Sequence, residues 1–275
     1  MTEKKKQGFG KVIGIAVGGA ILLVLIVVGA IVGPEMYRSS SYDKADVLFA
    51  SRDYQKAYDA FNKLGDYRDS AEKAAQSKQN LDYDQALADL NSGQIDRAMA
   101  ALIQLAKEGF PEAQLKLKML DEQAVRDELT AELGRFKSPQ FPLWQKDVKA
   151  TIDALVDMGV NSQDLIATWT EGFSYHIDSI TVNGATATAE VTITCKQYHP
   201  AANSAANLFL AVPNVGLMTE GEMVAKLGEL IYTELKAARP VTTKITIPCT
   251  KTGDTWTIGE SAEYEYYKAL FGISY

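Results

Sequence analysis

One segment near the start of the chain constrains its architecture most strongly. Positions 12–33 form an unbroken run of residues without a charged or strongly polar side chain. A helix of that length extends roughly 33 Å, enough to cross a hydrocarbon core of about 30 Å. Cleaved signal peptides have shorter apolar regions, of about 7–15 residues. The sequence therefore predicts an uncleaved transmembrane helix over residues 12–33.

The charges around this segment predict its orientation. Residues 1–11 form a basic tail with four lysines against Glu3, and no excess of positive charge follows the span. The positive-inside rule then predicts a cytoplasmic N-terminus, a single-pass location in the cell membrane, lipid contact through residues 12–33 and an extracytoplasmic C-terminal domain. The net charge of the whole chain is −7, so the part after the tail is strongly acidic. Nucleic acid is an unsuitable partner, because its phosphates require clustered Lys and Arg.

Two glycine pairs in the predicted span have the spacing that lets membrane helices approach closely. The pairs are Gly14 with Gly18 and Gly29 with Gly33. Such small-xxx-small patterns favour a homodimer through the transmembrane helix. Glycine is also common in membrane helices that do not pair, which is the alternative interpretation.

Residues 34–120 contain a helical pattern that recurs after 41 residues, so that Tyr42-Asp43-Lys44-Ala45 aligns with Tyr83-Asp84-Gln85-Ala86. Small alanines let neighbouring helices cross closely, and large apolar residues at helical spacing form a buried stripe. The predicted core of the repeat consists of Ala45, Tyr54, Ala57, Phe61, Leu64, Ala86, Ile95, Ala98, Leu102 and Leu105.

The turn Leu64-Gly65-Asp66-Tyr67-Arg68-Asp69-Ser70 in this region resembles bacterial extracytoplasmic members of the tetratricopeptide family. The period departs from the usual 34 residues, which predicts an extra helix over 69–80, with Asp69 as its N-cap and Glu72 as the capping partner. The resemblance implies paired helices that bind a protein or peptide. A stalk that holds the next domain is the equally weighted alternative.

Residues 121–275 change from a helical to an alternating pattern after Trp169. Tyr175 to Cys195 is predicted to form a β-hairpin, with Asn183-Gly184 as its turn. A two-residue loop there pairs Val182 with Ala185. A bulge near Asp178-Ser179 is needed to keep the start of the first strand in phase.

Further along, an apolar stretch without clear periodicity covers residues 201–218. Thr219 and Glu222 then form a capping box that begins a helix, and this helix ends before Pro240. A second hairpin with its turn at 252–254 and a short terminal helix follow.

This order of elements resembles the NTF2-like (cystatin-like) α+β superfamily, as found in surface proteins of Gram-positive bacteria. The residues that carry the resemblance are Tyr175-x-Ile177-x-x-Ile180-x-Val182-x-Gly184, Ala187-x-x-x-Val191-x-Ile193, Ile245-x-Ile247 and Gly253-Asp254-Thr255-Trp256-Thr257-Ile258. The resemblance implies a curved antiparallel sheet around helices, with a conical pocket. That fold serves both enzymes and non-catalytic binding modules, so it does not decide the function.

Catalytic chemistry has little support in the residues. His176 with Asp178 is the only plausible acid–base pair, and a solvated strand histidine at a bulge is the simpler interpretation. Two histidines and no Cys-x-x-Cys motif exclude the usual zinc sites. Neither a nucleophile elbow nor a phosphate-binding glycine loop is present. The sequence therefore predicts no cofactor and no metal site.

Cys195 and Cys249 are the only cysteines, and each ends an inward-phased strand pattern. If these strands are antiparallel neighbours, the two sulfurs lie too far apart for a disulfide. A parallel or non-adjacent arrangement permits the bond. The sequence leaves a disulfide and two buried thiols as alternatives.

The leading functional prediction is a non-enzymatic, membrane-anchored binding or scaffold protein. Its helical repeats form a stalk or an interaction surface, and its distal α+β domain binds a protein, a peptide or a cell-wall component. One alternative is a hydrolase or isomerase that uses the conical pocket. Another is a subunit of a cell-envelope complex.

Overall fold

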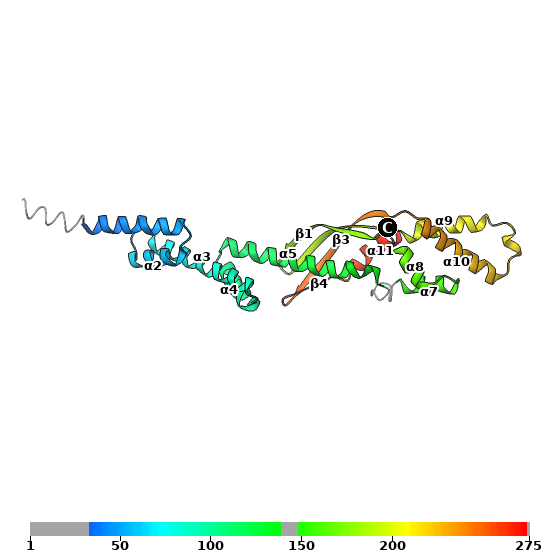
Figure 1. Ribbon diagram of the computed structural model, residues 1–275, viewed down its shortest axis with the longest axis horizontal. Helices are drawn as coiled ribbons and strands as arrows, with labels where there is room; N and C mark the ends of the chain where they lie inside the picture. Colours follow the sequence, from blue (N-terminus) through cyan, green and yellow to red (C-terminus); the bar gives the residue numbers. More distant parts are fainter. Residues whose placement is uncertain (1–32, 139–147, 274–275) are drawn as a thin grey trace, which may run out of the picture. The chain divides into compact units, whose positions relative to one another are not determined.

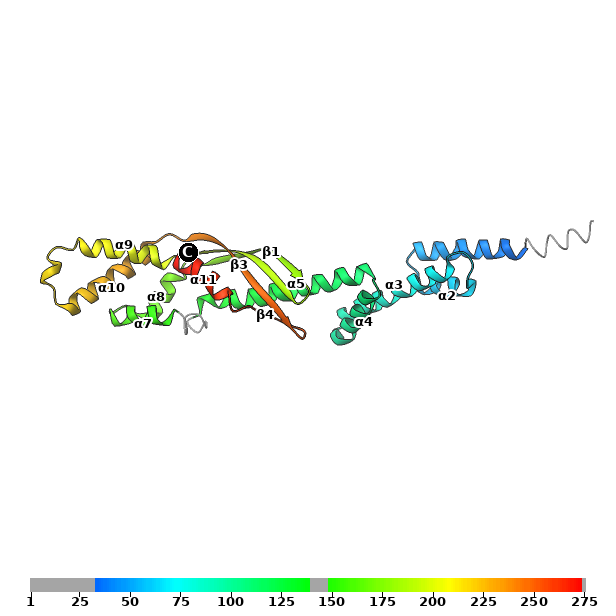
Figure 2. The same ribbon diagram turned by 180° about the vertical axis from the view of Figure 1, so that it is seen from behind.

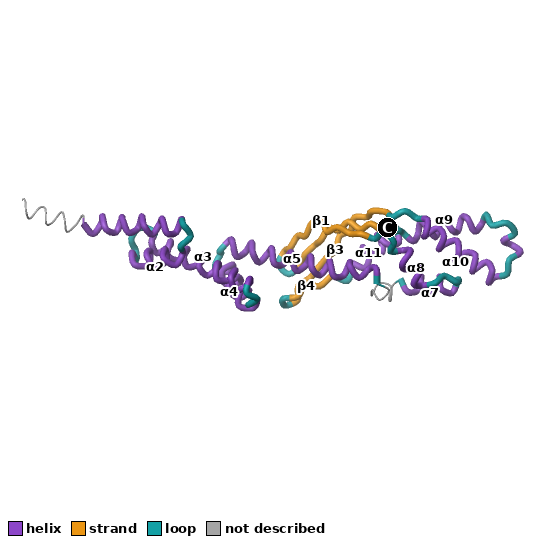
Figure 3. The backbone as a smooth tube through the Cα atoms, viewed as in Figure 1, coloured by secondary structure: helices purple, strands orange, loops and turns teal. Residues whose placement is uncertain are grey.

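The computed structural model describes residues 33–138 and 148–273 (Figure 1). The chain divides into two compact units, Met1–Leu117 and Lys118–Tyr275. The first is helical in its described part, and the second combines helices with one sheet (Figure 3).

The described part of the first unit is a series of helices joined by short turns. Its elements are a helix that covers residues 33–50, α2 (Tyr54–Leu64), α3 (Ser70–Asn91), α4 (Ile95–Lys107) and the first turns of α5 (Pro111–Gly134). α2 packs on α3, and α3 packs on α4. The side chain of Asp53 caps α2 by accepting a hydrogen bond from the Lys56 backbone N–H at 3.4 Å.

α3 differs from the helix predicted at 69–80, because it continues without a break to Asn91. No glycine or proline lies in this stretch to end the first helix, so the two predicted helices merge. Asp69 occupies the N-cap position but makes no capping bond. Its carboxylate instead accepts a hydrogen bond from the Tyr42 hydroxyl at 2.5 Å, which ties the start of α3 to the helix at residues 33–50.

The second unit is built on a four-stranded antiparallel sheet in which sequence neighbours pair, in the order β1-β2-β3-β4. Its strands are β1 (Ser174–Asn183), β2 (Thr186–Cys195), β3 (Val241–Thr252) and β4 (Thr255–Ile258). Its helices are the rest of α5, α7 (Lys149–Asp157), α8 (Ser162–Trp169), α9 (Tyr198–Leu210), α10 (Glu220–Ala237) and α11 (Ala262–Phe271), with short 3-10 turns at η1 (Arg135–Lys137) and η2 (Val215–Leu217).

The first hairpin has a different register from the one predicted. Val182 pairs with Ala187 rather than with Ala185, because the turn is Gly184-Ala185 and Asn183 belongs to β1. A shift of two residues keeps every side chain on its expected face, since the period of a strand is two. The predicted bulge is confirmed by the irregular register between Ile177 and Ser179.

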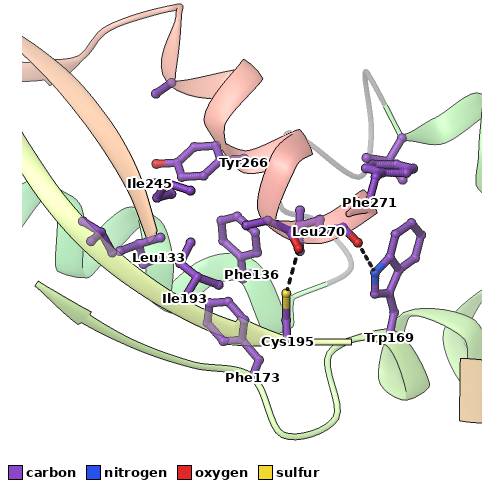
Figure 4. Packing of buried hydrophobic residues seen from close by; sticks show 14 of the residues in the cluster. Leu133, Phe136, Trp169, Phe173, Ile193, Cys195, Ile245, Tyr266, Leu270 and Phe271 are labelled. Carbon is purple, nitrogen blue, oxygen red and sulfur yellow. Dashed lines mark hydrogen bonds between the residues drawn. The ribbon is translucent and has the colours of Figure 1, made fainter. Parts of the chain in front are cut away.

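The core of the second unit covers one face of the sheet. Inward-facing residues of β2 and β3 pack beneath α11, and aromatic residues fill the space between them (Figure 4). Phe136 stacks on Phe173 with ring centroids 5.1 Å apart and meets Tyr266 edge-on at 5.3 Å. Trp169 donates its indole N–H to the Leu270 carbonyl at 3.2 Å. Side chains therefore occupy the place expected for a conical pocket.

The predicted transmembrane helix is not supported. Among the described residues, no helix has both the length and the apolar character needed to cross a membrane. Gly33 belongs to a helix that reaches residue 50 and carries Glu35, Arg38 and Asp43, while residues 12–32 of the predicted span lie outside the described part. The fold class is therefore corrected to helices with a four-stranded antiparallel sheet, and the single-pass membrane location is withdrawn.

Candidate functional site

His176 and Asp178 lie on the open face of the sheet, not in a pocket. The His176 side chain is 79% exposed, and its Nε2 atom is 3.8 Å from the Asp178 carboxylate. Asp178 accepts a hydrogen bond from the Thr192 hydroxyl at 2.7 Å and lies 3.4 Å from the Lys244 ammonium. The Thr192 hydrogen bond, with Lys244, lowers the pKa of Asp178. A solvated imidazole beside a weakly basic carboxylate is unsuited to general base catalysis.

The aromatic side chains that could close the predicted pocket are all buried. Trp169 and Phe173 belong to the core described above, and Trp256 donates its indole N–H to Asp121 at 2.9 Å. Within residues 33–138 and 148–273, no group of His, Cys, Asp and Glu side chains is placed to hold a metal ion. Trp169, Phe173 and Trp256 thus belong to the packed interior of the second unit.

Cys195 and Cys249 are free, buried thiols. β2 and β3 are antiparallel neighbours, in which Cys195 pairs with Val241 and Cys249 pairs with Ala187. Val241, the partner of Cys195, is eight positions from Cys249 along β3, and this separation corresponds to roughly 27 Å at the rise of a strand. Burial raises the pKa of Cys195 to about 12 and that of Cys249 to about 11. A disulfide between them is impossible in this fold.

Most of the repeat positions face the interior of the first unit. The buried members are Ala45, Ala57, Phe61, Leu64, Ala86, Ala98, Leu102 and Leu105. Tyr54 is partly buried and meets Phe49 edge-on at 5.7 Å. Ile95 is 50% exposed and lies outside the stripe, because it occupies the first position of α4. Of the predicted helix-packing glycines, Gly33 is exposed, and Gly14, Gly18 and Gly29 lie outside the described residues.

The turn that resembles the tetratricopeptide family has a structural role. The guanidinium of Arg68 lies 5.0 Å from the ring of Tyr42 and 5.1 Å from that of Tyr67. Arg68 has a left-handed backbone with φ of 53°, and its side chain reaches Tyr42 in the helix at residues 33–50. Together with the Tyr42–Asp69 hydrogen bond, these contacts hold the first helix against α3.

A helical arm is the most distinctive feature of the second unit. It consists of α9, η2 and α10, and it connects β2 to β3. α9 and α10 pack along each other, and both extend beyond the end of the sheet (Figures 1 and 2). The Thr219 capping box predicted from the sequence is confirmed at the start of α10.

The root of the arm is fixed by buried polar contacts. The ammonium of Lys196 is almost fully buried, and it donates to the Glu171 carboxylate at 2.7 Å and to the Lys236 carbonyl at 2.9 Å. These bonds join the end of β2, the turn before β1 and the last turn of α10. Farther along the arm, Ser204 of α9 donates to Glu234 of α10 at 2.6 Å.

The outer part of the arm has no core of its own. From residue 206 to residue 227, every side chain is either exposed or only partly buried, and Leu227 packs partly against the core of the unit. The segment is nevertheless rich in large apolar residues, of which Leu210 is 78% exposed and Leu217 is 85% exposed. Leu208 and Val224 are also exposed. Exposed apolar clusters of this kind mark interaction surfaces in folded proteins.

The charge pattern of the arm is equally unusual. Between residues 197 and 219 there is no Asp, Glu, Lys or Arg. The first charged residues beyond this stretch are Glu220 and Glu222, in the first turn of α10. The next basic residue, Lys226, is engaged by Glu229 at 2.9 Å. The end of the arm is thus apolar with an acidic border.

The aperiodic apolar stretch at 201–218 is visible in the sequence, but its pattern alone predicts no role for it. Its signal was the absence of charge over a length that exceeds a strand or a short buried helix. A hydrophobic run is ordinarily assigned to the core, because burial is the usual fate of leucine and valine. Only the fold places this run beyond the end of the sheet.

Comparisons with known proteins add little to this description. No protein-family model matches the sequence, and no curated protein matches it. Among solved structures, a crystal structure of a "putative lipoprotein (ycdA)" from Bacillus subtilis is 13% identical, with a TM-score of 0.35. That match covers 52% of this chain and 44% of the Bacillus chain, so it spans less than half of that protein's length. Neither of the predicted family resemblances is supported by these comparisons.

Proposed function

We propose that this chain is a non-enzymatic binding protein that recruits a protein partner through the end of its helical arm. The observation that carries the proposal is that four large apolar side chains of residues 206–227 are exposed, namely Leu208, Leu210, Leu217 and Val224, and that no residue of this segment is fully buried. Leaving such residues in water costs about 1.5–3 kcal/mol per large apolar side chain relative to burial. A partner that covers the tip recovers this free energy.

The rigid root of the arm supports the same proposal. The Lys196 bonds and the close packing of α10 on the α7–α8 turn hold the arm in one direction. A presented element that is already ordered loses little conformational entropy when it binds. The side chain of His176, by contrast, is 79% exposed on the open face of the sheet, which does not favour the enzyme alternative.

The proposal is tested by removing the exposed leucines without touching the core. In the double variant Leu210→Ser/Leu217→Ser, we expect the complex that the tagged chain forms in its own cells to be lost. The matched control is Leu115→Ser, since Leu115 is also exposed but belongs to α5 in the first unit. The melting temperature of both variants should remain close to that of the wild type. If the double variant keeps the complex, or if Leu115→Ser loses it as well, the proposal is wrong.

A further inference from the structure

Resting on this proposed function, we infer that the tip of the arm docks into an apolar pocket of a partner protein whose border carries lysine or arginine. The leucines of the tip supply the apolar surface, and Glu220 with Glu222 supplies the charge. Complementary charges around an apolar centre select the partner and accelerate its association.

Both glutamates are exposed and lie in the first turn of α10. Glu222 accepts hydrogen bonds from the backbone N–H and the hydroxyl of Thr219, both at 2.8 Å. The backbone hydrogen bond from Thr219 lowers the pKa of Glu222, so this carboxylate is ionised at neutral pH. The capping box also prevents Glu222 from swinging away from the tip.

The same charges disfavour the other two occupants of an exposed apolar tip. Segments that insert into a membrane surface usually carry lysine, arginine, tryptophan or tyrosine at their border. In the tip segment, residues 206–227, the one residue of these four types is Lys226, whose ammonium is paired with Glu229 at 2.9 Å, and the acidic border repels anionic lipid. A second copy of this chain that packs tip to tip brings Glu220 and Glu222 against their own equivalents, which like-charge repulsion opposes.

The test uses two fluorescent peptides with one apolar sequence, flanked by four lysines in the first and by four glutamates in the second. Binding to the full chain is measured by fluorescence polarisation at low and at high salt. We expect the lysine-flanked peptide to bind about tenfold more tightly at low salt, with the difference shrinking as salt screens the charges. Phosphatidylcholine vesicles and sedimentation of the chain alone probe the other occupants.

Two variants separate the contributions. Glu220→Gln/Glu222→Gln removes the charge and keeps the capping box available, because glutamine also serves at its third helical position. We expect it to abolish the preference for lysine and to retain the remaining affinity. Leu210→Ser/Leu217→Ser should weaken both peptides by tenfold or more.

The outcomes distinguish this inference from the proposed function. Binding that depends on the leucines but not on peptide charge overturns the basic border alone. Leucine-dependent binding to vesicles, or leucine-dependent dimers, replaces the inferred partner by a membrane or by a second copy. If neither peptide binds, or if binding is unchanged in Leu210→Ser/Leu217→Ser, the proposed function is contradicted as well.

Discussion

Gly228 of α10 packs directly against Met158 of the α7–α8 turn, more tightly than either other glycine of the arm packs against its surroundings. A Cβ atom added at position 228 would lie 2.5 Å from the Met158 Cβ atom and 2.8 Å from its carbonyl oxygen. Real Cβ atoms do not approach other atoms so closely, so only glycine lets α10 rest on this turn. This contact fixes α10 against the α7–α8 turn at position 228.

Gly228→Ala should therefore destabilise the second unit, although alanine is the better helix former. Overpacking of this kind costs about 1–3 kcal/mol, which outweighs the gain of about 1 kcal/mol in helix propensity. Gly221→Ala in the same helix is the matched control, because position 221 has open space around it. Chemical denaturation should show a loss for the first variant and no loss for the second. Equal stability of the two variants would refute the close contact.

Lys196→Met removes the donor that links Glu171 to the Lys236 carbonyl at the root of the arm. We expect a loss of about 1–3 kcal/mol in the free energy of unfolding, because the carbonyl is left without that donor. Lys236→Met is the control, since the side chain of Lys236 is exposed and only its backbone is used. A change of similar size in both variants would argue against the contact.

The contribution of this contact should also depend on pH. The hydrogen bond from Lys196 lowers the pKa of Glu171. A lowered carboxyl pKa adds stability that is complete above the ordinary glutamate value of about 4.3 and is lost as the pH falls through the folded-state value. The difference in stability between wild type and Glu171→Gln should therefore be constant near neutral pH and shrink in acid. A difference that grows in acid would contradict this sign.

The thiols of Cys195 and Cys249 should be present in full and hidden in the folded protein. Under denaturing, non-reducing conditions, a thiol reagent should count two groups per chain, because the antiparallel register keeps the sulfurs apart. In the native state both should react slowly even at pH 9, because they are buried and their pKa values are raised to about 12 and 11. A count of zero thiols would demonstrate a disulfide and a different strand arrangement.

Phe136→Ala should produce a large cavity beneath the sheet. Phe136 is fully buried between Phe173 and Tyr266, and its truncation should cost about 3–5 kcal/mol. The same substitution at Phe209, in the part of the arm without buried residues, should cost less than about 1 kcal/mol. Denaturant titrations of the two variants check the contrast, and comparable losses would mean that the arm has a core after all.

The elements that sequence analysis predicted well are those with local signals. The Thr219 capping box, the bulge near Asp178 and the turn at Gly253 each depend on a few neighbouring residues. The predicted register of the first hairpin was wrong by two residues. Asn183 pairs with Thr186 as the last residue of β1, so the two-residue turn is Gly184-Ala185 and not Asn183-Gly184. Ile95 was wrongly assigned to the core. Helical periodicity shows which face of a helix is apolar, but it does not show whether the first residue of that face is covered by a neighbour.

The candidate site was beyond the reach of the sequence for a different reason. An uncharged apolar run such as 201–218 fits a buried helix, a membrane segment or an exposed tip equally well. Which of these it becomes depends on long-range contacts, such as Lys196 with Lys236 and Gly228 with Met158, that set where the arm leaves the sheet. Those contacts join residues far apart in the chain, and no local sequence pattern predicts them.

The most direct test of the arm as a docking element is photo-crosslinking in intact cells that make the protein. A photoreactive phenylalanine analogue replaces Leu217 at the tip in one variant and Thr188 on the open face of the sheet in another. We predict a discrete crosslink to another protein from position 217 and none from position 188. No crosslink from position 217, or the same products from both positions, would contradict the proposed function.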